Sequence, residues 1–321
     1  MLRRMITGQS SKTAETAAAF RARETLKPEG ERVCSDPLAR HFIGPFYIAM
    51  GRHPWLGRFF RRLGESQFPG LGSAVLARTR YIDEHTKTCL GNGIRQVVIL
   101  GAGYDTRAYR LVDPAQGVRV FEVDHPATQS VKRVKLQEVL GTIPHHVEFV
   151  AVDFGRDALA SRLIEAGYDP AKRTLFIWEG VSYYLTAAAV DQTLAFMARN
   201  SAMGSVILFD FFPRAVIDGT SRRKEAITLR KRLKQRGEPL LFGIDDEDVV
   251  PFLRARGFET LEVVGAAACK DAWFHGANRD TEVSDIFRFV HAVRINNIVA
   301  FDQERFQAAH PTTEEEETCK N

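Results

Sequence analysis

Residues 96–107 read Gln-Val-Val-Ile-Leu-Gly-Ala-Gly-Tyr-Asp-Thr-Arg, an apolar and largely β-branched run that stops at two closely spaced glycines. The run predicts a buried strand, and a short helix through Arg107 and Tyr109 is expected after the turn. Glycines let a ligand approach the backbone closely, and the N-terminus of a following helix presents free N–H groups. The stretch therefore predicts a nucleotide-like ligand at the end of a parallel strand, without deciding which ligand.

The composition is that of a globular protein without a strong charge bias. The 321 residues are 45% hydrophobic and 26% charged, and the net charge is +4. This charge is too small to argue for a nucleic-acid partner, and no apolar run approaches the ~18 residues of a membrane span. The four cysteines form no CxxC pair, which favours a reduced compartment and offers no metal site. Since no secretory signal is evident, we expect a cytoplasmic protein without a membrane partner.

From residue 96 onward, strand patterns alternate with helical patterns. This alternation predicts an α/β fold with a mostly parallel sheet and crossover helices. Two further strands, 259–264 and 285–294, have no helical pattern between them and are expected to close the sheet as an antiparallel pair. We expect the other strands over 96–100, 118–123, 146–150, 174–178 and 205–211, and helices over 126–140, 156–166, 186–200, 221–236 and 245–256.

Upstream of the sheet, residues 1–90 are expected to form an N-terminal helical cap. It contains helical patterns over 12–26 and 71–90, separated by an irregular zone over 40–70 that is rich in aromatic residues. We interpret this zone either as a lid or substrate wall, or as a packed part of the cap. The other predicted parts are the sheet domain, a lid inserted into it and a disordered acidic tail: 91–300, 212–245 and 301–321.

Two acidic residues stand at the end of the second strand. Asp124 follows the first glycine of the turn by about 20 positions, which is where a carboxylate accepts hydrogen bonds from the two hydroxyls of a ribose. Glu122, on the same face of the strand, is the second candidate. The alternative is that Asp124 only caps the helix that begins at Pro126. No partner for a 2′-phosphate is evident, which disfavours NADP.

The third and fourth strands also end in polar or aromatic residues. Asp153 and Phe154 could hold an adenine base, or Asp153 could simply cap the next helix. Glu179 follows the fourth strand and could bind an ammonium group, because a buried carboxylate without a cationic partner would be costly. Tyr183 and Tyr184 could form a wall of the pocket or pack in the core.

Several basic residues lie outside the sheet. One of Arg78 and Arg80 could clamp a carboxylate, while the other pairs with a surface acid; Arg21 is a further candidate. The basic segment 221–236 is interpreted as a solvated helix face, or as a surface that attracts an acidic substrate or an acidic carrier protein.

Five motifs in this order resemble the leucine carboxyl methyltransferase family, in particular its bacterial branch of S-adenosylmethionine-dependent O-methyltransferases, some of which serve polyketide pathways. The resemblance covers roughly residues 12–295 and is carried by residues 77–80, 98–111, 122–126, 153–154 and 179–185. It implies a Rossmann-like methyltransferase fold, with a seven-stranded, mostly parallel sheet whose last strand is antiparallel, behind an N-terminal helical cap. It also implies S-adenosylmethionine as the cofactor.

The resemblance further implies roles for individual residues. Gly101 and Gly103 would lie under the methionine part of the cofactor and Asp124 at the ribose. The others match as follows: Asp153 and Phe154 at the adenine, Glu179 at the amino-acid end, Arg78 at the cofactor carboxylate, and Arg21 at the N-terminal basic position. Eukaryotic members methylate the C-terminal leucine of a phosphatase subunit, and this substrate is not implied for a chain closer to the bacterial pattern.

The expected activity is methyl transfer to a carboxylate, or to a phenol or enol, of a small acidic molecule, for example of polyketide type. A carboxylate needs no base, and no histidine in the motifs is an evident base, so the carboxylate is favoured. Arg80, Tyr183 and Tyr184 are the candidates to position it. The alternatives are an NAD-dependent dehydrogenase and a catalytically silent cofactor-binding module. The sequence does not indicate an oligomeric state.

Overall fold

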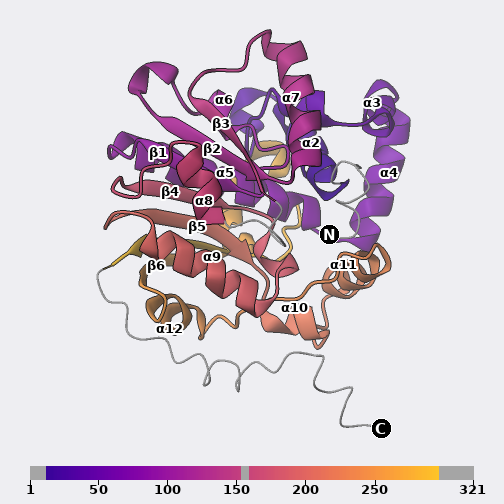
Figure 1. Ribbon diagram of the computed structural model, residues 1–321. Helices are drawn as coiled ribbons and strands as arrows, with labels where there is room; N and C mark the ends of the chain where they lie inside the picture. The colour runs from indigo at the N-terminus through magenta and orange to yellow at the C-terminus, as the bar shows by residue number, and fades with distance from the viewer. Residues whose placement is uncertain (1–11, 153–158, 296–321) are drawn as a thin grey trace.

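The computed structural model describes residues 12–152 and 159–295, and a seven-stranded sheet forms its centre (Figure 1). The strand order is β3-β2-β1-β4-β5-β7-β6, in which β1 to β5 are parallel and β7 runs antiparallel to both of its neighbours. The expected fold class is therefore confirmed. The strands are β1 (Gln96–Leu100), β2 (Arg119–Asp124), β3 (Val147–Ala151), β4 (Thr174–Trp178), β5 (Val206–Phe211), β6 (Phe258–Gly265) and β7 (Arg288–Arg294).

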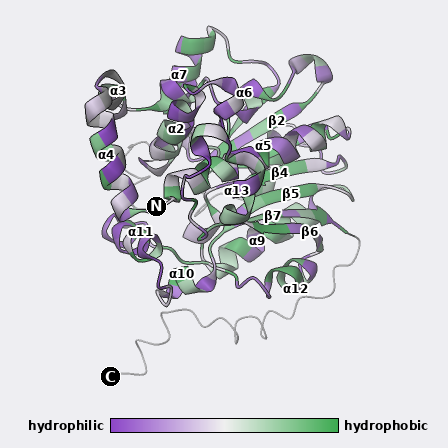
Figure 2. Ribbon diagram, turned by 180° about the vertical axis from the view of Figure 1, so that it is seen from behind, coloured by the Kyte–Doolittle hydropathy of each residue, from purple (hydrophilic) through white to green (hydrophobic). Residues whose placement is uncertain are grey.

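Helices cover both faces of the sheet because alternate strand residues point to opposite sides. In β1, Val97 and Ile99 pack into one core cluster together with α5 (Leu71–Gly91), whereas Val98 and Leu100 belong to a second cluster. The second cluster contains residues of α8 (Leu159–Glu165), α9 (Ala187–Arg199) and α12 (Val249–Arg254). Figure 1 shows α8, α9 and α12 on the near face, and Figure 2 shows α5 and α13 (Lys270–Trp273) on the opposite face.

The N-terminal region is more helical than the sequence indicates. The two predicted helices are present as α2 (Lys12–Thr25) and α5, but the zone over 40–70, expected to be irregular, contains α3 (Pro45–Arg52) and α4 (Pro54–Gln67). Each of these begins with a proline in its first turn, where the missing N–H costs no hydrogen bond. α5, which we assigned to the cap, packs directly on the sheet and shares its core.

The region after β5 also differs in part from the expected pattern. α10 (Arg214–Asp218) and α11 (Lys224–Gln235) lie in the predicted lid, and α11 lies next to α4 (Figure 1). The helix predicted over 245–256 is confined to α12, since the Asp245 carboxylate accepts a hydrogen bond from the backbone N–H of Arg214 instead of starting a helix. The sequence analysis predicted no helix between β6 and β7, and this is wrong: the short helix α13 lies there. α7 (Pro126–Leu140) has the predicted bounds.

None of the helices in the described ranges is long and apolar enough to cross a lipid bilayer. The predicted acidic tail, 301–321, lies outside the described residues.

Candidate active site

A cavity opens at the carboxyl ends of β1 and β4, where the strand order reverses direction. The space between its walls is about 840 Å³, a value that includes open solvent. The predicted site residues among its lining are Arg21, Arg78, Gly101, Gly103, Asp124, Glu179, Tyr183 and Tyr184. Asp153 and Phe154 lie outside the described residues.

The glycine turn after β1 forms the floor of the cavity. Gly101 has a φ of +65°, and a Cβ atom there would lie 2.3 Å from Cγ2 of Val181. Gly103 has a φ of +43°, and a Cβ atom there would lie 3.3 Å from the Cβ of Ala14. Only glycine fits the first position without displacing its neighbour, so the turn brings bare backbone to the ligand.

Of the two acidic residues in β2, Asp124 is the one that faces the cavity. Its carboxylate accepts hydrogen bonds from the backbone N–H groups of Gly103, at 2.5 Å, and His125, at 2.6 Å. Burial raises its pKa, against the effect of these two bonds. The side chain of His125 caps α7, so the structure gives no support to a capping role of Asp124. Glu122 is fully buried within 2.7 Å of Lys132 Nζ and does not line the cavity.

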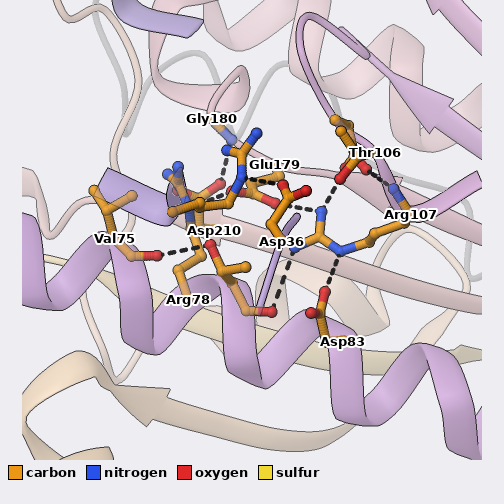
Figure 3. Close-up of polar contacts among 12 residues, drawn as sticks. Asp36, Val75, Arg78, Asp83, Thr106, Arg107, Glu179, Gly180 and Asp210 are labelled. Atoms are coloured by element: carbon orange, nitrogen blue, oxygen red, sulfur yellow. Dashed lines mark hydrogen bonds and ion pairs between the residues drawn. The ribbon is translucent and has the colours of Figure 1, made fainter. Parts of the chain in front are cut away.

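Glu179, directly after β4, is held between two arginines (Figure 3). Oε1 lies 2.9 Å from Nε of Arg78, and Oε2 lies 2.6 Å from Nη1 of Arg107. Burial opposes ionisation, but the charges of Arg107 and Arg78 outweigh it and lower the pKa of Glu179 to about 2. The sequence analysis suggested a cationic ligand group as the partner of Glu179, and the structure shows that two arginines of the chain itself already pair with it.

The same two arginines connect the cap to the ends of the strands. Arg78, on α5, also donates from Nη1 to Asp210 in β5 at 2.6 Å. Arg107, after the glycine turn, donates from Nε to Asp83 on α5 at 2.7 Å and pairs with Asp105. The network thus ties α5 to β1, β4 and β5. Asp210 was missed, although a single acid in the apolar strand Val-Ile-Leu-Phe-Asp-Phe is a signal for a buried partner.

Arg21 and Arg80 have different positions. The guanidinium of Arg21 lines the cavity, where Nε donates to Asp36 at 2.8 Å and Nη2 donates to the carbonyl oxygen of Tyr104 at 2.6 Å. Arg80 does not line the cavity: its side chain is 40% exposed and pairs with Glu84 one turn along α5. The structure therefore gives no support to Arg80 as a substrate-positioning residue, and it is the arginine that pairs with a surface acid.

The far end of the cavity is formed by segments outside the sheet. Tyr183 and Tyr184 belong to the 3₁₀ helix η4 (Ser182–Tyr184) and pack against each other, with ring centroids 4.8 Å apart. Thr13 of α2 and Glu238, which follows α11, complete this end, and Thr13 Oγ1 donates to Glu238 Oε2 at 3.4 Å. Thr13 lies in the helical pattern predicted over 12–26 but was not assigned a role in the site, and Glu238 was missed because it lies in a segment without a recognisable pattern.

The charges on the cavity wall are predominantly negative. Among the described lining residues, four carboxylates stand against two guanidiniums: Asp105, Asp124, Glu179 and Glu238 against Arg21 and Arg78. No group of three or more potential metal ligands occurs in the part of the chain that the structure describes. The wall therefore suits an organic cation better than an anion.

Comparisons with known proteins agree with this arrangement. A family model described as leucine carboxyl methyltransferase matches residues 14–198. The "Putative S-adenosyl-L-methionine-dependent methyltransferase YktD" of Bacillus subtilis is 31% identical over 226 residues, which cover 70% of this chain and 73% of YktD. A protein of Mycobacterium avium with the same descriptive name is 35% identical over 271 residues, 78% of this chain and 81% of its own length.

Solved structures share the fold at low sequence identity. A crystal structure titled as a "putative methyltransferase" from Thermobifida fusca superposes with a TM-score of 0.58 at 14% identity, covering 91% of this chain and 97% of that one. A duf574 family protein from Streptomyces avermitilis gives a TM-score of 0.57 at 13% identity, covering 89% and 98%. At such identities the likeness concerns the fold alone.

Proposed function

The chain belongs to the leucine carboxyl methyltransferase family and is an S-adenosylmethionine-dependent methyltransferase, and on this premise we propose that it transfers the methyl group to an oxygen atom of a small molecule. The acceptor is a carboxylate, or the hydroxyl of a phenol or enol, in a weakly or strongly acidic metabolite, for example of polyketide type. The alternatives derived from the glycine turn alone were an NAD-dependent dehydrogenase and a silent cofactor-binding module.

The observation that carries the proposal is the charge of the cavity wall. The cofactor has a sulfonium, an ammonium and a carboxylate, and is therefore a net cation. A wall with four carboxylates and two guanidiniums favours such a ligand. NAD is an anion because of its pyrophosphate, and the same wall would repel it. The charge therefore supports the methyltransferase over the dehydrogenase.

The residues present fit the cofactor at several points. Asp124 has spare lone pairs after its two backbone hydrogen bonds and would accept from the ribose hydroxyls. Gly101 and Gly103 would lie under the methionine part. Glu179 would orient the ammonium group and Arg78 would meet the carboxylate, both held in place by the buried network.

The cofactor supplies an electrophilic methyl group, so the protein's contribution is to bring an acceptor oxygen into line with it. Tyr183 and Tyr184 line the cavity, and we propose that the acceptor oxygen lies beside them. Burial first of all raises the pKa of both phenols, so each stays protonated and would donate a hydrogen bond to the acceptor.

The substrate could be presented by an acidic carrier protein. The basic side chains of Arg230, Lys231 and Lys234 on α11 are exposed, and the segment that follows this helix supplies Glu238 to the cavity. A basic surface beside the acceptor end would attract an acidic partner by long-range electrostatics.

Calorimetric titration of the purified protein tests the proposal. S-adenosylhomocysteine should bind and NAD should not. Asp124→Ala should weaken S-adenosylhomocysteine roughly 10- to 100-fold, since hydrogen bonds to a charged group are worth about 1.5–3 kcal/mol. The exposed Asp280→Ala is the matched control and should bind like the wild type. Binding of NAD without binding of S-adenosylhomocysteine would contradict the proposal, and tight binding without methyl transfer to any acid or hydroxyl would favour the silent module.

A further inference from the structure

One carboxylate at the acceptor end of the cavity differs from the others on the wall. Glu238 is half-buried, and its recorded partner is the hydroxyl of Thr13 at 3.4 Å. By contrast, Glu179 and Asp105 are each paired with an arginine, and Asp124 accepts from two backbone N–H groups. Among the described lining residues, Glu238 is therefore the carboxylate with the most freedom to interact with a second ligand.

The cations on the wall are already engaged with acids. Arg78 lies against Glu179 and Asp210 and would also meet the carboxylate of the cofactor, and Arg21 lies against Asp36. A carboxylate acceptor would thus find no unpaired cation among the described lining residues, and it would meet the charge of Glu238. Because a desolvated charge is costly without an opposite partner, this end of the cavity disfavours an anionic acceptor.

The other groups near the acceptor end are unsuited to accept a proton. Burial raises the pKa of the phenols of Tyr183 and Tyr184, and the charge of Glu238 raises that of Tyr184 further. The two arginines around Glu179 hold its carboxylate in the ionised form. Among the described lining residues, Glu238 remains as the carboxylate that contacts Thr13 and that no arginine or backbone N–H group holds in place.

We propose that the acceptor is a neutral hydroxyl of a phenol or enol, and that Glu238 is the general base that removes its proton. The inference rests on the proposed methyltransferase function and narrows its substrate class. In the step, an oxygen lone pair forms a bond to the methyl carbon while the bond from that carbon to sulfur breaks. The hydroxyl proton passes to Glu238, the electron pair of the broken bond stays on sulfur, and S-adenosylhomocysteine and an ether leave.

Substituted phenols provide a test that separates this role from a structural one. Methyl transfer by the wild type and by Glu238→Gln is measured for phenol and 2-naphthol, which are neutral at the assay pH, and for 4-nitrophenol, which is largely ionised. We expect Glu238→Gln to lower kcat roughly 100-fold for the neutral acceptors, the low end for general-base catalysis, and to change it little for the ionised one. Glu238→Asp should restore part of the activity.

The controls distinguish loss of the general base from loss of the folded state and from failure of the proposed methyltransferase function. Both Glu238 variants should bind S-adenosylhomocysteine like the wild type, and Glu138→Gln, an exposed change on α7, should alter nothing. An equal loss for neutral and ionised phenols would overturn the role of Glu238, and faster methylation of 2-naphthoate than of 2-naphthol by the wild type would overturn the substrate class. Failure to bind S-adenosylhomocysteine would instead overturn the proposed function.

Discussion

The two ends of the cavity are built in different ways. The cofactor end consists of the ends of parallel strands and the glycine turn, and buried ion pairs hold its side chains (Figure 3). The acceptor end consists of α2, η4 and the segment after α11, and its carboxylate is only half-buried. The ends of the strands thus hold the cofactor end together, whereas under the proposed function the segments outside the sheet would contact the methyl acceptor.

The largest effect on the free energy of unfolding is expected from removing the charge of Glu179, which pairs with Arg78 and Arg107 at the cofactor end. Glu179→Gln leaves Arg78 and Arg107 without one partner each. We expect a loss of roughly 3 kcal/mol in the free energy of unfolding, near the lower end for a broken buried pair, because both arginines keep another carboxylate. Urea unfolding at neutral pH measures this loss, and calorimetry should show weaker binding of S-adenosylhomocysteine.

This prediction has a pH dependence of definite sign. The pKa of Glu179 falls from 4.5 to about 2 on folding, so its ionised form stabilises the protein above pH ~4.5, and this contribution disappears as the pH falls toward 2. The difference between wild type and Glu179→Gln should therefore shrink over that interval. Glu148→Gln, which breaks an exposed pair with Arg119, is the control and should cost less than about 1 kcal/mol. A difference that stays constant with pH would show that Glu179 is not held by charge.

A smaller effect is expected from filling the glycine turn. In Gly101→Ala the new methyl group meets Val181 and the backbone keeps a positive φ, and we expect a loss of roughly 2 kcal/mol. Gly117 has the same φ of +65° with nothing within 4 Å, so Gly117→Ala isolates the backbone cost, about 1 kcal/mol.

Urea unfolding and S-adenosylhomocysteine titration of both variants separate the two contributions. Only Gly101→Ala should weaken the binding of S-adenosylhomocysteine. Adding Val181→Ala to Gly101→Ala should recover the steric part of the loss, and the double-mutant cycle measures it. Equal losses in Gly101→Ala and Gly117→Ala would mean that close packing at the turn does not define the cofactor end.

The cofactor end could be predicted largely from the sequence, because strand residues repeat with period two and a parallel sheet gathers its strand ends at one edge. Asp124, Gly101, Gly103 and Glu179 were placed in this way. The partners of Glu179 were not foreseen, since Arg78 lies on a helix and Arg107 lies beyond the turn. Their contacts depend on how α5 packs across the sheet, which no local pattern encodes.

The acceptor end could not be predicted to the same degree. α4 contributes none of the described lining residues of the cavity, and its sequence is strongly amphipathic, so its helical period was available to sequence analysis. The segment was interpreted as irregular because it is rich in glycine and aromatic residues, of which Trp55 and Phe59 remain 66% and 59% exposed. Glu238 lies between helices in a segment without periodicity. The segment is joined to the cavity wall by tertiary contacts, among them the hydrogen bond from the backbone N–H of Leu241 to the carbonyl oxygen of Tyr183 at 2.8 Å. Such tertiary contacts place residues that a linear motif does not include.

The smallest effect is expected from Arg80→Ala, a substitution on the side of α5 that does not line the cavity. Arg80 and Arg78 are two residues apart on α5 and therefore point to different sides of the helix. Arg80 pairs with Glu84 in the less favourable i,i+4 orientation, with both side chains about 40% exposed, so Arg80→Ala should change the free energy of unfolding by less than about 0.5 kcal/mol. Its kcat, KM and affinity for S-adenosylhomocysteine should match those of the wild type. A tenfold rise in KM for the methyl acceptor would instead place Arg80 at the acceptor end and extend that end to the outer side of α5.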